Sequence, residues 1–466
     1  MKNFDLLIIG GGAAAFAAAI RADALKARTA LVNTGLPLGG TCVNVGCVPS
    51  KTLLYAGELL HHAAAGVPGV ELAVKSFDFR KVVRSELALV GRLRREKYTK
   101  VLANLKHVTV FQGTARFVSG DEVEVNGARL RAGKFLIAAG STANVPPIEG
   151  LREAGFVTHI GALRLARLPR ELVIIGAGPV GLEFAQMYSR FGTKVTLLQR
   201  GPSILPRTEP ALAARLAALL AREGITIKTE VALRRAWKEG GRKFVAYTSG
   251  GRPGRISADE ILLAAGKTPN TRGLGLAAAG VKLDTRLAVT IDKYFRTSNP
   301  RIFAAGDVAA APRRLEAVAG REGTLAAENA LKGARLSIDY NTVPYTVFTD
   351  PQLAGVGLTE DEQLVKTRAC ACRTVSFADV PKAVIMRRTE GLIKMTADPR
   401  TRRILGVHIL APSAGEIISG AMLLLANRNT IDDAAGALPM FPTLSEALKL
   451  AALSFTRDID KLSCCI

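Results

Sequence analysis

Two stretches of the chain have the same pattern: an apolar run, then a cluster of small residues, then a helical pattern. Asp5–Ile9 is a mostly apolar run that leads into GGGAAA at 10–15, and an alanine-rich helical pattern follows to Leu25. In the same way, Glu171–Ile175 leads into GAGPVG at 176–181, and a helical pattern follows from Leu182 to Phe191. A buried strand, a tight glycine turn and a helix form the fingerprint in which a pyrophosphate lies at a helix N-terminus. The pattern predicts two dinucleotide sites.

The strand that follows each fingerprint indicates which nucleotide binds there. Thr29–Val32 ends in Asn33, where an acidic residue often holds the ribose hydroxyls, and an amide can still form hydrogen bonds at that position. Lys194–Leu198 is followed by Gln199 and Arg200, which offer no carboxylate for a 2′-hydroxyl but a guanidinium for a 2′-phosphate. We therefore expect the second site to prefer NADPH over NADH.

Later changes in the pattern divide the chain into domains. Apolar strands end shortly before Gly140 and Gly266, and these turns are the points where the chain is expected to pass between the two nucleotide domains. From about residue 341 the pattern changes to strands with proline-rich turns and two helices, 414–427 and 445–455. The expected fold is α/β, with two Rossmann-like domains (1–150 with 267–338, and 151–266) followed by an α+β domain (339–466).

Composition and charge exclude several classes of protein. The chain has 466 residues, of which 48 % are hydrophobic and 22 % charged, as is typical of a soluble globular protein with several domains. Its net charge is +23, but the basic residues are scattered and not interleaved with aromatic ones, so no nucleic-acid binding is expected. Glycines interrupt the apolar segment 4–20, unlike a signal peptide, and no segment approaches the roughly 20 apolar residues of a membrane span. We expect a cytoplasmic protein that does not enter a membrane.

Six cysteines form three close pairs, at 42 and 47, 370 and 372, and 464 and 465. The first pair lies in GGTCVNVGCVPSK at 39–51, where glycines and a following lysine indicate a reactive dithiol at the start of a helix. A helix N-terminus and a nearby cation lower the pKa of a thiol. Cys370 and Cys372 alternate along a probable strand and face the same side, so they could bind a metal, although incidental packing is the favoured interpretation.

In their order along the chain these motifs resemble the class I flavoprotein pyridine nucleotide-disulfide oxidoreductases, a family that includes glutathione reductase and dihydrolipoamide dehydrogenase. The resemblance implies a homodimer with FAD in the first domain, NADPH in the second and a dimerisation role for the third. It implies that Cys42 exchanges with substrate, that Cys47 lies against the flavin as a thiolate, and that Lys51 pairs with Glu183. The implied FAD contacts are Gly10, Gly12, Ala15, Asn33, Gly40, Thr41, Lys51, Ala115, Gly140 and Asp307, and the implied NADPH contacts are Gly176, Gly178, Gly181, Arg200 and Gly266. Asp307 could instead cap a helix.

The segment PMFPTLSE at 439–446 indicates the substrate class. Disulfide reductases of the family carry a histidine five residues before the catalytic glutamate, which is Glu446 here, and this chain has Phe441 in that place, a residue with no proton to transfer. Two adjacent thiols at Cys464 and Cys465 can instead capture a soft ion.

This combination resembles the mercuric reductase branch of the family, and specifically its catalytic core, because the first strand begins at residue 4. The resemblance implies that Hg(II) arrives as thiol complexes, passes from Cys464 and Cys465 of the partner subunit to Cys42 and Cys47, and is reduced to Hg(0). Phe441 and Pro179 replace residues that carry hydroxyl groups in other members. The alternatives are a dihydrolipoamide dehydrogenase-like or other disulfide reductase, an NADPH oxidase of the same fold, or a thiol-based sensor that has lost turnover.

Overall fold

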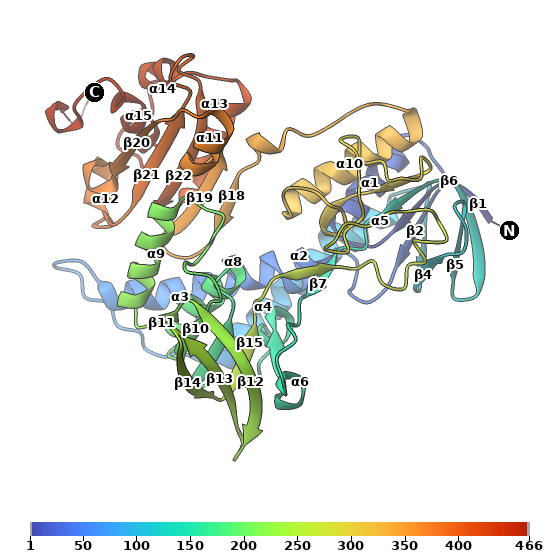
Figure 1. Ribbon diagram of the computed structural model, residues 1–466, viewed down its shortest axis with the longest axis horizontal. Helices are drawn as coiled ribbons and strands as arrows, with labels where there is room; N and C mark the ends of the chain where they lie inside the picture. Colours follow the sequence, from blue (N-terminus) through green and yellow to red (C-terminus); the bar gives the residue numbers. More distant parts are fainter. Residues whose placement is uncertain (1, 464–466) are drawn as a thin grey trace.

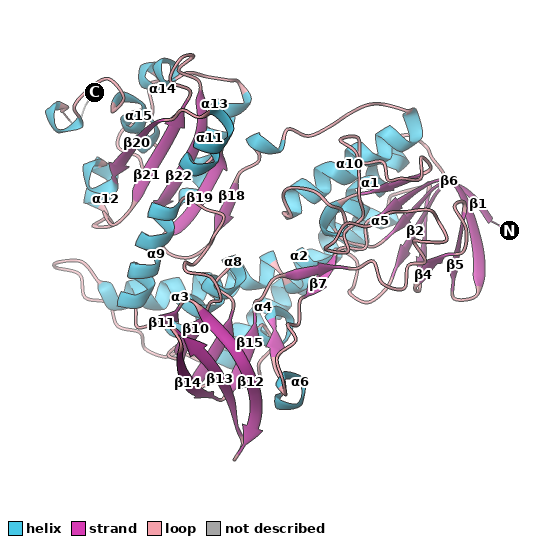
Figure 2. Ribbon diagram, in the orientation of Figure 1, coloured by secondary structure: helices cyan, strands magenta, loops and turns pink. Residues whose placement is uncertain are grey.

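The computed structural model describes residues 2–463, and Figure 1 shows that they form three units. The N-terminal unit carries the first fingerprint, the middle unit carries the second, and the C-terminal unit contains about the last quarter of the chain. Figure 2 shows a sheet with flanking helices in each unit. The α/β fold with two Rossmann-like units and a C-terminal α+β unit is thereby confirmed.

The N-terminal unit is built on a mainly parallel sheet. Its strands are β3 (Val108–Gln112), β2 (Thr29–Asn33), β1 (Lys2–Ile9), β6 (Ala128–Ile137), β5 (Glu122–Val125) and β4 (Ala115–Phe117), in this order, with β17 (Ile302–Ala304) beside β6. Alternate residues of β1 lie on opposite faces, so Leu6 packs with α1 (Ala13–Ala24) and α10 (Glu316–Lys332), whereas Leu7 packs on the other face. The small residues of α1 allow close packing, since a Cβ at Gly323 of α10 would lie 2.0 Å from the Ala14 carbonyl oxygen.

The middle unit has a parallel sheet for the second fingerprint. Its strands are β11 (Thr226–Lys228), β10 (Lys194–Leu198), β9 (Glu171–Ile175), β15 (Glu260–Leu263) and β8 (Val157–Thr158), in this order, and an antiparallel sheet of β12 (Val231–Glu239), β13 (Arg242–Ser249) and β14 (Arg252–Ala258) lies beside it. Its helices are α6 (Leu151–Ala154), α7 (His159–Ala162), α8 (Pro179–Arg190) and α9 (Pro210–Arg222). Helix α8 begins at Pro179, three residues before the expected Leu182, because proline fits the first turn of a helix.

Helices from the N-terminal part of the chain connect the first two units. They are α2 (Gly40–Val45), α3 (Cys47–Ala65) and α4 (Phe79–Arg94), followed by a π-helix (Arg95–Thr99) and α5 (Lys100–Ala103). Leu53 of α3 and Phe79 of α4 are buried in the same hydrophobic core as Tyr188 of α8. A short antiparallel pair, β7 (Ser141–Ala143) and β16 (Lys267–Pro269), marks the two crossings of the chain between the units.

The C-terminal unit contains an antiparallel sheet. Its strands are β18 (Tyr345–Val347), β19 (Gln352–Gly357), β22 (Ile404–Ala411), β21 (Leu392–Ala397) and β20 (Ala371–Ser376), in this order. One face packs on α13 (Ala414–Ala426), α14 (Ile431–Gly436) and α15 (Glu446–Leu453), while α11 (Glu360–Thr367) and α12 (Pro381–Ile385) lie near its ends. Short 3₁₀ turns are Gly306–Val308, Tyr340–Thr342, Phe377–Asp379 and Ile459–Lys461. In the described part of the chain no helix is both long and apolar enough to cross a membrane.

Candidate active site

The paired thiols of Cys42 and Cys47 lie where α2 meets α3. The sequence suggested one helix start, but the chain forms two helices: Cys42 lies in α2, and Cys47 is the first residue of α3. Gly46 allows this junction, because a Cβ there would lie 2.9 Å from the Thr41 carbonyl oxygen and 3.2 Å from Cys42 Cα. Both cysteines are free thiols, so the pair is present in its reduced form.

The two thiols have opposite shifts in pKa. A hydrogen bond with Cys42 lowers the pKa of Cys47 from 9.0 to about 7, against the opposing effect of burial, and the Lys51 ammonium adds a further lowering. The same hydrogen bond, together with burial, raises the pKa of Cys42. Near neutral pH the arrangement therefore holds one thiolate, at Cys47, with Cys42 as its proton donor.

Lys51 and Glu183 meet although they are far apart in the sequence. Lys51 Nζ donates a hydrogen bond to Glu183 Oε2 over 2.7 Å, and Glu183 Oε1 accepts one from the Phe348 backbone N–H at 2.9 Å. The ammonium also lies 4.6 Å from the centre of the Phe348 ring. Glu183 is 5 % exposed, so the ion pair is well shielded. The ion pair holds α3, one turn beyond Cys47, against α8 of the middle unit.

The first glycine loop lies directly against the dithiol. A Cβ at Gly40 would be 2.5 Å from Gly12 Cα, and a Cβ at Gly10 would be 2.2 Å from the Ala138 carbonyl oxygen. These positions leave a backbone cradle that only glycine can form. A cavity of about 170 Å³ opens beside it, lined by Gly12, Thr41, Cys42, Cys47, Gly140 and Asp307 among others.

Asp307 occupies the turn after β17 rather than capping a long helix. Its Oδ2 accepts a hydrogen bond from Ser141 Oγ at 2.6 Å. Behind the turn, fully buried Glu322 accepts hydrogen bonds from the Gly306 N–H at 2.7 Å and the Tyr340 hydroxyl at 2.6 Å. Burial raises the pKa of Glu322. Glu322 was missed from the sequence because its two partners, Gly306 and Tyr340, come from different segments of the chain.

Of the remaining expected FAD residues, Asn33 and Ala15 lie beside the first loop, whereas Ala115 lies at the edge of the sheet. Asn33 ends β2, and its amide donates to the Leu36 carbonyl at 3.1 Å while a Cβ at Gly11 would lie 2.3 Å from its Oδ1. Ala15 is buried in the first turn of α1, and Ala115 is buried in β4. Asn33 thus packs against the glycine loop that a nucleotide would approach.

The second glycine loop opens on a cavity of about 740 Å³, whose lining includes Gly176, Gly178, Arg200 and Gly266. Gly181 is not in the lining but lies behind the loop, where a Cβ would be 1.9 Å from the Gly176 carbonyl oxygen. The sequence identified Gln199 only as a residue without a carboxylate for the ribose. In the structure it accepts a hydrogen bond from the Ala177 N–H at 3.1 Å and so fixes the loop.

His159 is a further residue of this cavity that no sequence motif indicated. It is buried at the start of α7, and its Nε2 has no hydrogen-bond partner among the described residues. Burial lowers the pKa of His159 from 6.5 to about 4, so the ring is neutral at pH 7.

Other expected site residues lie away from the dithiol of the same chain. Glu446 begins α15 in the C-terminal unit, where its Oε2 accepts a hydrogen bond from the Thr443 N–H at 3.0 Å. Phe441 is exposed on the same unit, which Figure 1 shows apart from α2. Cys464 and Cys465 lie outside the described residues. A single chain therefore does not bring Glu446 to Cys42 and Cys47.

Comparison with known families accounts for nearly the whole chain. The model of the pyridine nucleotide-disulphide oxidoreductases matches residues 4–332, and the model of their dimerisation domain matches residues 343–452. The chain belongs to this family. Membership implies use of a flavin and a pyridine nucleotide, and the dimerisation domain indicates a homodimer.

Individual relatives extend over the same length. The chain is 42 % identical to a mercuric reductase of Streptomyces lividans, over 99 % of this chain and 98 % of the relative. It is 38 % identical to a mercuric reductase of Lysinibacillus sphaericus, over 99 % and 84 %. Among solved structures, the HOCl-induced flavoprotein disulfide reductase RclA from Escherichia coli matches with a TM-score of 0.86 and 28 % identity, over 97 % of this chain and 100 % of that one.

The residues present fit the two cofactors that the family implies. Each glycine loop leaves a cradle in which a Cβ would clash with neighbouring backbone, and each opens on a cavity. The orphaned Nε2 of His159 in the second cavity is a polar atom that a ligand could satisfy. The first loop and its cavity therefore fit a flavin nucleotide, and the second loop and its cavity fit a pyridine nucleotide.

Proposed function

We propose that the protein reduces Hg(II) to Hg(0) with electrons from NADPH, by way of FAD and the Cys42 and Cys47 pair. The observation that carries the proposal is a reduced dithiol with one stabilised thiolate, held beside the first nucleotide loop in a chain that has Phe441 where a proton-transferring histidine would stand. Full-length similarity to mercuric reductases supports the same choice of substrate.

The cofactors would bind at the two loops. Gly10, Gly12, Gly40, Thr41 and Asp307 would hold FAD, and Gly176, Gly178, Arg200 and Gly266 would hold NADPH, with Arg200 facing the 2′-phosphate. FAD would supply a two-electron carrier between the nucleotide and the dithiol. The corresponding domains would be 1–150 with 267–338, 151–266, and 339–466, in a cytoplasmic homodimer.

The residues of the chain would then act on the metal ion. Hg(II) prefers sulfur ligands, so Cys47 as thiolate and Cys42 as thiol can displace two carrier thiolates and bind the ion between them, and the Cys42 proton passes to one of the departing thiolates. Lys51, held by Glu183, stabilises the negative charge at Cys47. The overall reaction converts NADPH and Hg(II) into NADP⁺, one proton and Hg(0), and it needs no histidine to protonate a leaving thiolate.

Delivery of the ion would involve the second subunit. In this proposal Cys464 and Cys465 of one chain capture Hg(II) from thiol complexes and pass it to Cys42 and Cys47 of the partner, near Glu446 from that same C-terminal unit. The proposal fits the separation, within one chain, between the C-terminal unit and α2.

The test is NADPH oxidation by the holoprotein with Hg(II) in excess small thiol, with volatile mercury collected in parallel. Stimulation with stoichiometric Hg(0) is expected, and Cys42→Ser with Cys47→Ser should abolish it. Cys464→Ala with Cys465→Ala should fail mainly when small thiols are scarce. Turnover with lipoamide, glutathione disulfide or O₂ but not with Hg(II) would replace the proposal by a disulfide reductase or an oxidase.

A further inference from the structure

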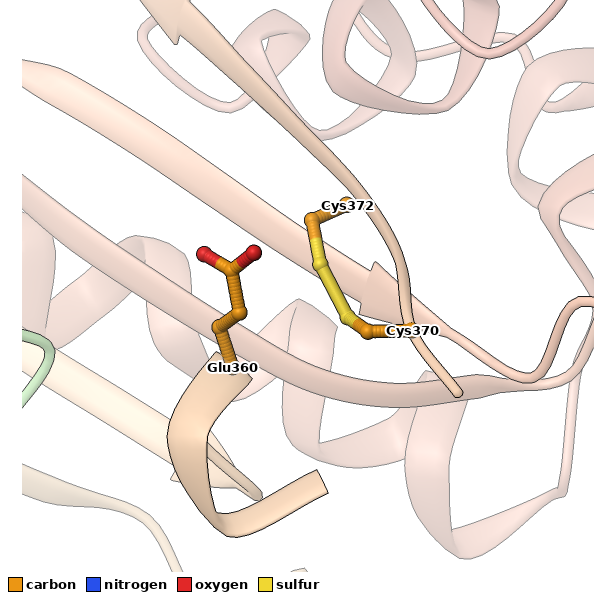
Figure 3. A group of neighbouring side chains, drawn as sticks. All are labelled: Glu360, Cys370 and Cys372. Carbon is orange, nitrogen blue, oxygen red and sulfur yellow. A yellow bond between two sulfur atoms is a disulfide. The ribbon is translucent and has the colours of Figure 1, made fainter. Parts of the chain in front are cut away.

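A third cysteine pair forms a cluster outside the active site. Cys370 and Cys372 are joined by a disulfide at the start of β20, with their Cα atoms 5.9 Å apart. Incidental packing, which the sequence favoured, is therefore wrong. Figure 3 shows the carboxylate of Glu360, from the first turn of α11, lying beside the sulfur atoms. One ligand atom from each of the three residues lies within 4.8 Å of the others.

Hydrogen bonds hold both sides of this cluster in place. On one side, the Thr359 side chain and Glu362 form a capping box that fixes the first turn of α11. On the other, fully buried Gln363 donates from Nε2 to the carbonyl oxygens of Ala369 at 3.1 Å and Ala397 at 2.8 Å. The loop before Cys370 is thereby fixed between α11 and β21.

The charges around the cluster leave room for a cation. Lys394 Nζ bonds to Glu360 Oε2 and, at 2.6 Å, to Glu209 Oε1, so two carboxylates share one ammonium. Lys394 and Glu209 have side chains only 10 % and 3 % exposed, so their pairing is shielded from solvent, whereas the Glu360 side chain is 37 % exposed and open to a ligand. Lys394 engages one oxygen of Glu360, and Oε1 can serve as a ligand.

The disulfide itself adds little to stability. In the chain-entropy model a disulfide stabilises by closing a loop of the unfolded chain, and the effect grows with loop length. Cys370 and Cys372 are separated by one residue, so their loop is among the shortest possible. Because β20 is an edge strand, the pair lies at the border of the sheet, and both side chains are partly exposed.

We propose that Cys370 and Cys372, once reduced, form with Glu360 a second binding site for a soft divalent metal ion. The reductant is a low-molecular-weight thiol: two thiols reduce the disulfide, leaving two cysteine thiols and one external disulfide. Binding then releases two protons as the thiolates take the ion. Thiolates favour soft or borderline ions, and on a tetrahedral ion at 2.3 Å two sulfurs lie roughly 3.8 Å apart. Alternate residues of a strand reach this spacing on one face.

Cadmium binding to the full-length protein tests the site without the other thiols. Cys42, Cys47, Cys464 and Cys465 are replaced by serine, the protein is reduced, the reductant is removed without air, and Cd(II) is added by equilibrium dialysis. One tightly bound ion per subunit, with thiolate-to-metal charge-transfer absorption, is expected for the reduced form and none for the disulfide form. Adding Cys370→Ser and Cys372→Ser should weaken binding at least 100-fold.

Two charge variants in the same background test the carboxylate. Glu360→Gln should weaken binding about tenfold, whereas Asp361→Asn, on the same exposed turn and with the same change in charge, should leave it unchanged. Circular dichroism checks that each variant is folded. Equal binding by the reduced and disulfide forms, or equal affinity of the two charge variants, would overturn the three-ligand site. Because the background lacks Cys42 and Cys47, failure here leaves mercury reduction untouched.

Discussion

Replacing Cys42 with alanine is expected to move the ionisation of Cys47 by about two pH units. The hydrogen bond with Cys42 is the largest influence that lowers the pKa of Cys47 from 9.0 to about 7. Without that donor, burial remains and the pKa returns to its ordinary value or above. At pH 7 the thiolate fraction then falls from about one half to about 1 %, which corresponds to about 2.7 kcal/mol.

The rate of reaction at Cys47 falls by less than this fraction. A thiolate of higher pKa is more nucleophilic, with a Brønsted coefficient of about 0.4 to 0.5, so two units raise the intrinsic rate roughly eightfold. The observed rate at pH 7 should therefore fall only about sixfold. Well above pH 9, where Cys47 is ionised in both proteins, the alanine variant should react faster than the parent protein, so the two pH profiles cross.

The assay is exchange with a small aromatic disulfide between pH 5 and 10, with modification of the Cys47 peptide followed by mass spectrometry. Cys42→Ser is the matched control, because its hydroxyl can still donate to the thiolate and should keep the midpoint near pH 7. A midpoint that stays near 7 in Cys42→Ala would refute the reasoning. The Lys51 charge and the start of α3 would then hold the thiolate, and Lys51→Met should shift the midpoint instead.

Three further predictions follow from burial and close contacts. Burial raises the pKa of Glu86 from 4.5 to about 7, so its contribution to stability is lost as pH rises through 7. In urea denaturation, Glu86→Gln should raise the free energy of unfolding by up to about 3 kcal/mol at pH 8 and leave it unchanged at pH 4.5. Burial lowers the pKa of His159 to about 4, so stability falls as pH drops from 6.5 toward 4, and in His159→Gln the urea midpoint should change less over this range. Gly181→Ala places a Cβ 1.9 Å from the Gly176 carbonyl oxygen and should weaken NADPH binding at least tenfold in a fluorescence titration while the flavin stays bound; unchanged affinity would contradict the close helix-to-strand contact.

Local patterns were enough to predict the strands and loops of both fingerprints. Glu171–Ile175 and Lys194–Leu198 are strands with the expected bounds, because a short apolar run between turns has few other solutions. Helix ends were less accurate: the C-terminal helix expected at 445–455 is Glu446–Leu453. The bond between Cys370 and Cys372 was missed, since alternation along a strand shows that two thiols share a face but not that they are joined.

The contacts that bring the site together could not be read from local pattern, because they depend on how α3 packs. Lys51 and Glu183 are 132 positions apart, and only the family resemblance suggested that they meet. The structure supplies the physical reason: at Gly57 of α3 a Cβ would lie 3.4 Å from Arg190 Cβ of α8, so the helices can approach closely and the ion pair lies along the same contact. At its other end α3 begins with Cys47, next to the loop of Gly12 and Gly40. Helix α3 therefore connects the thiolate and first glycine loop to the helix of the second fingerprint, so the packing of α3 on α8 positions the dithiol relative to both nucleotide loops.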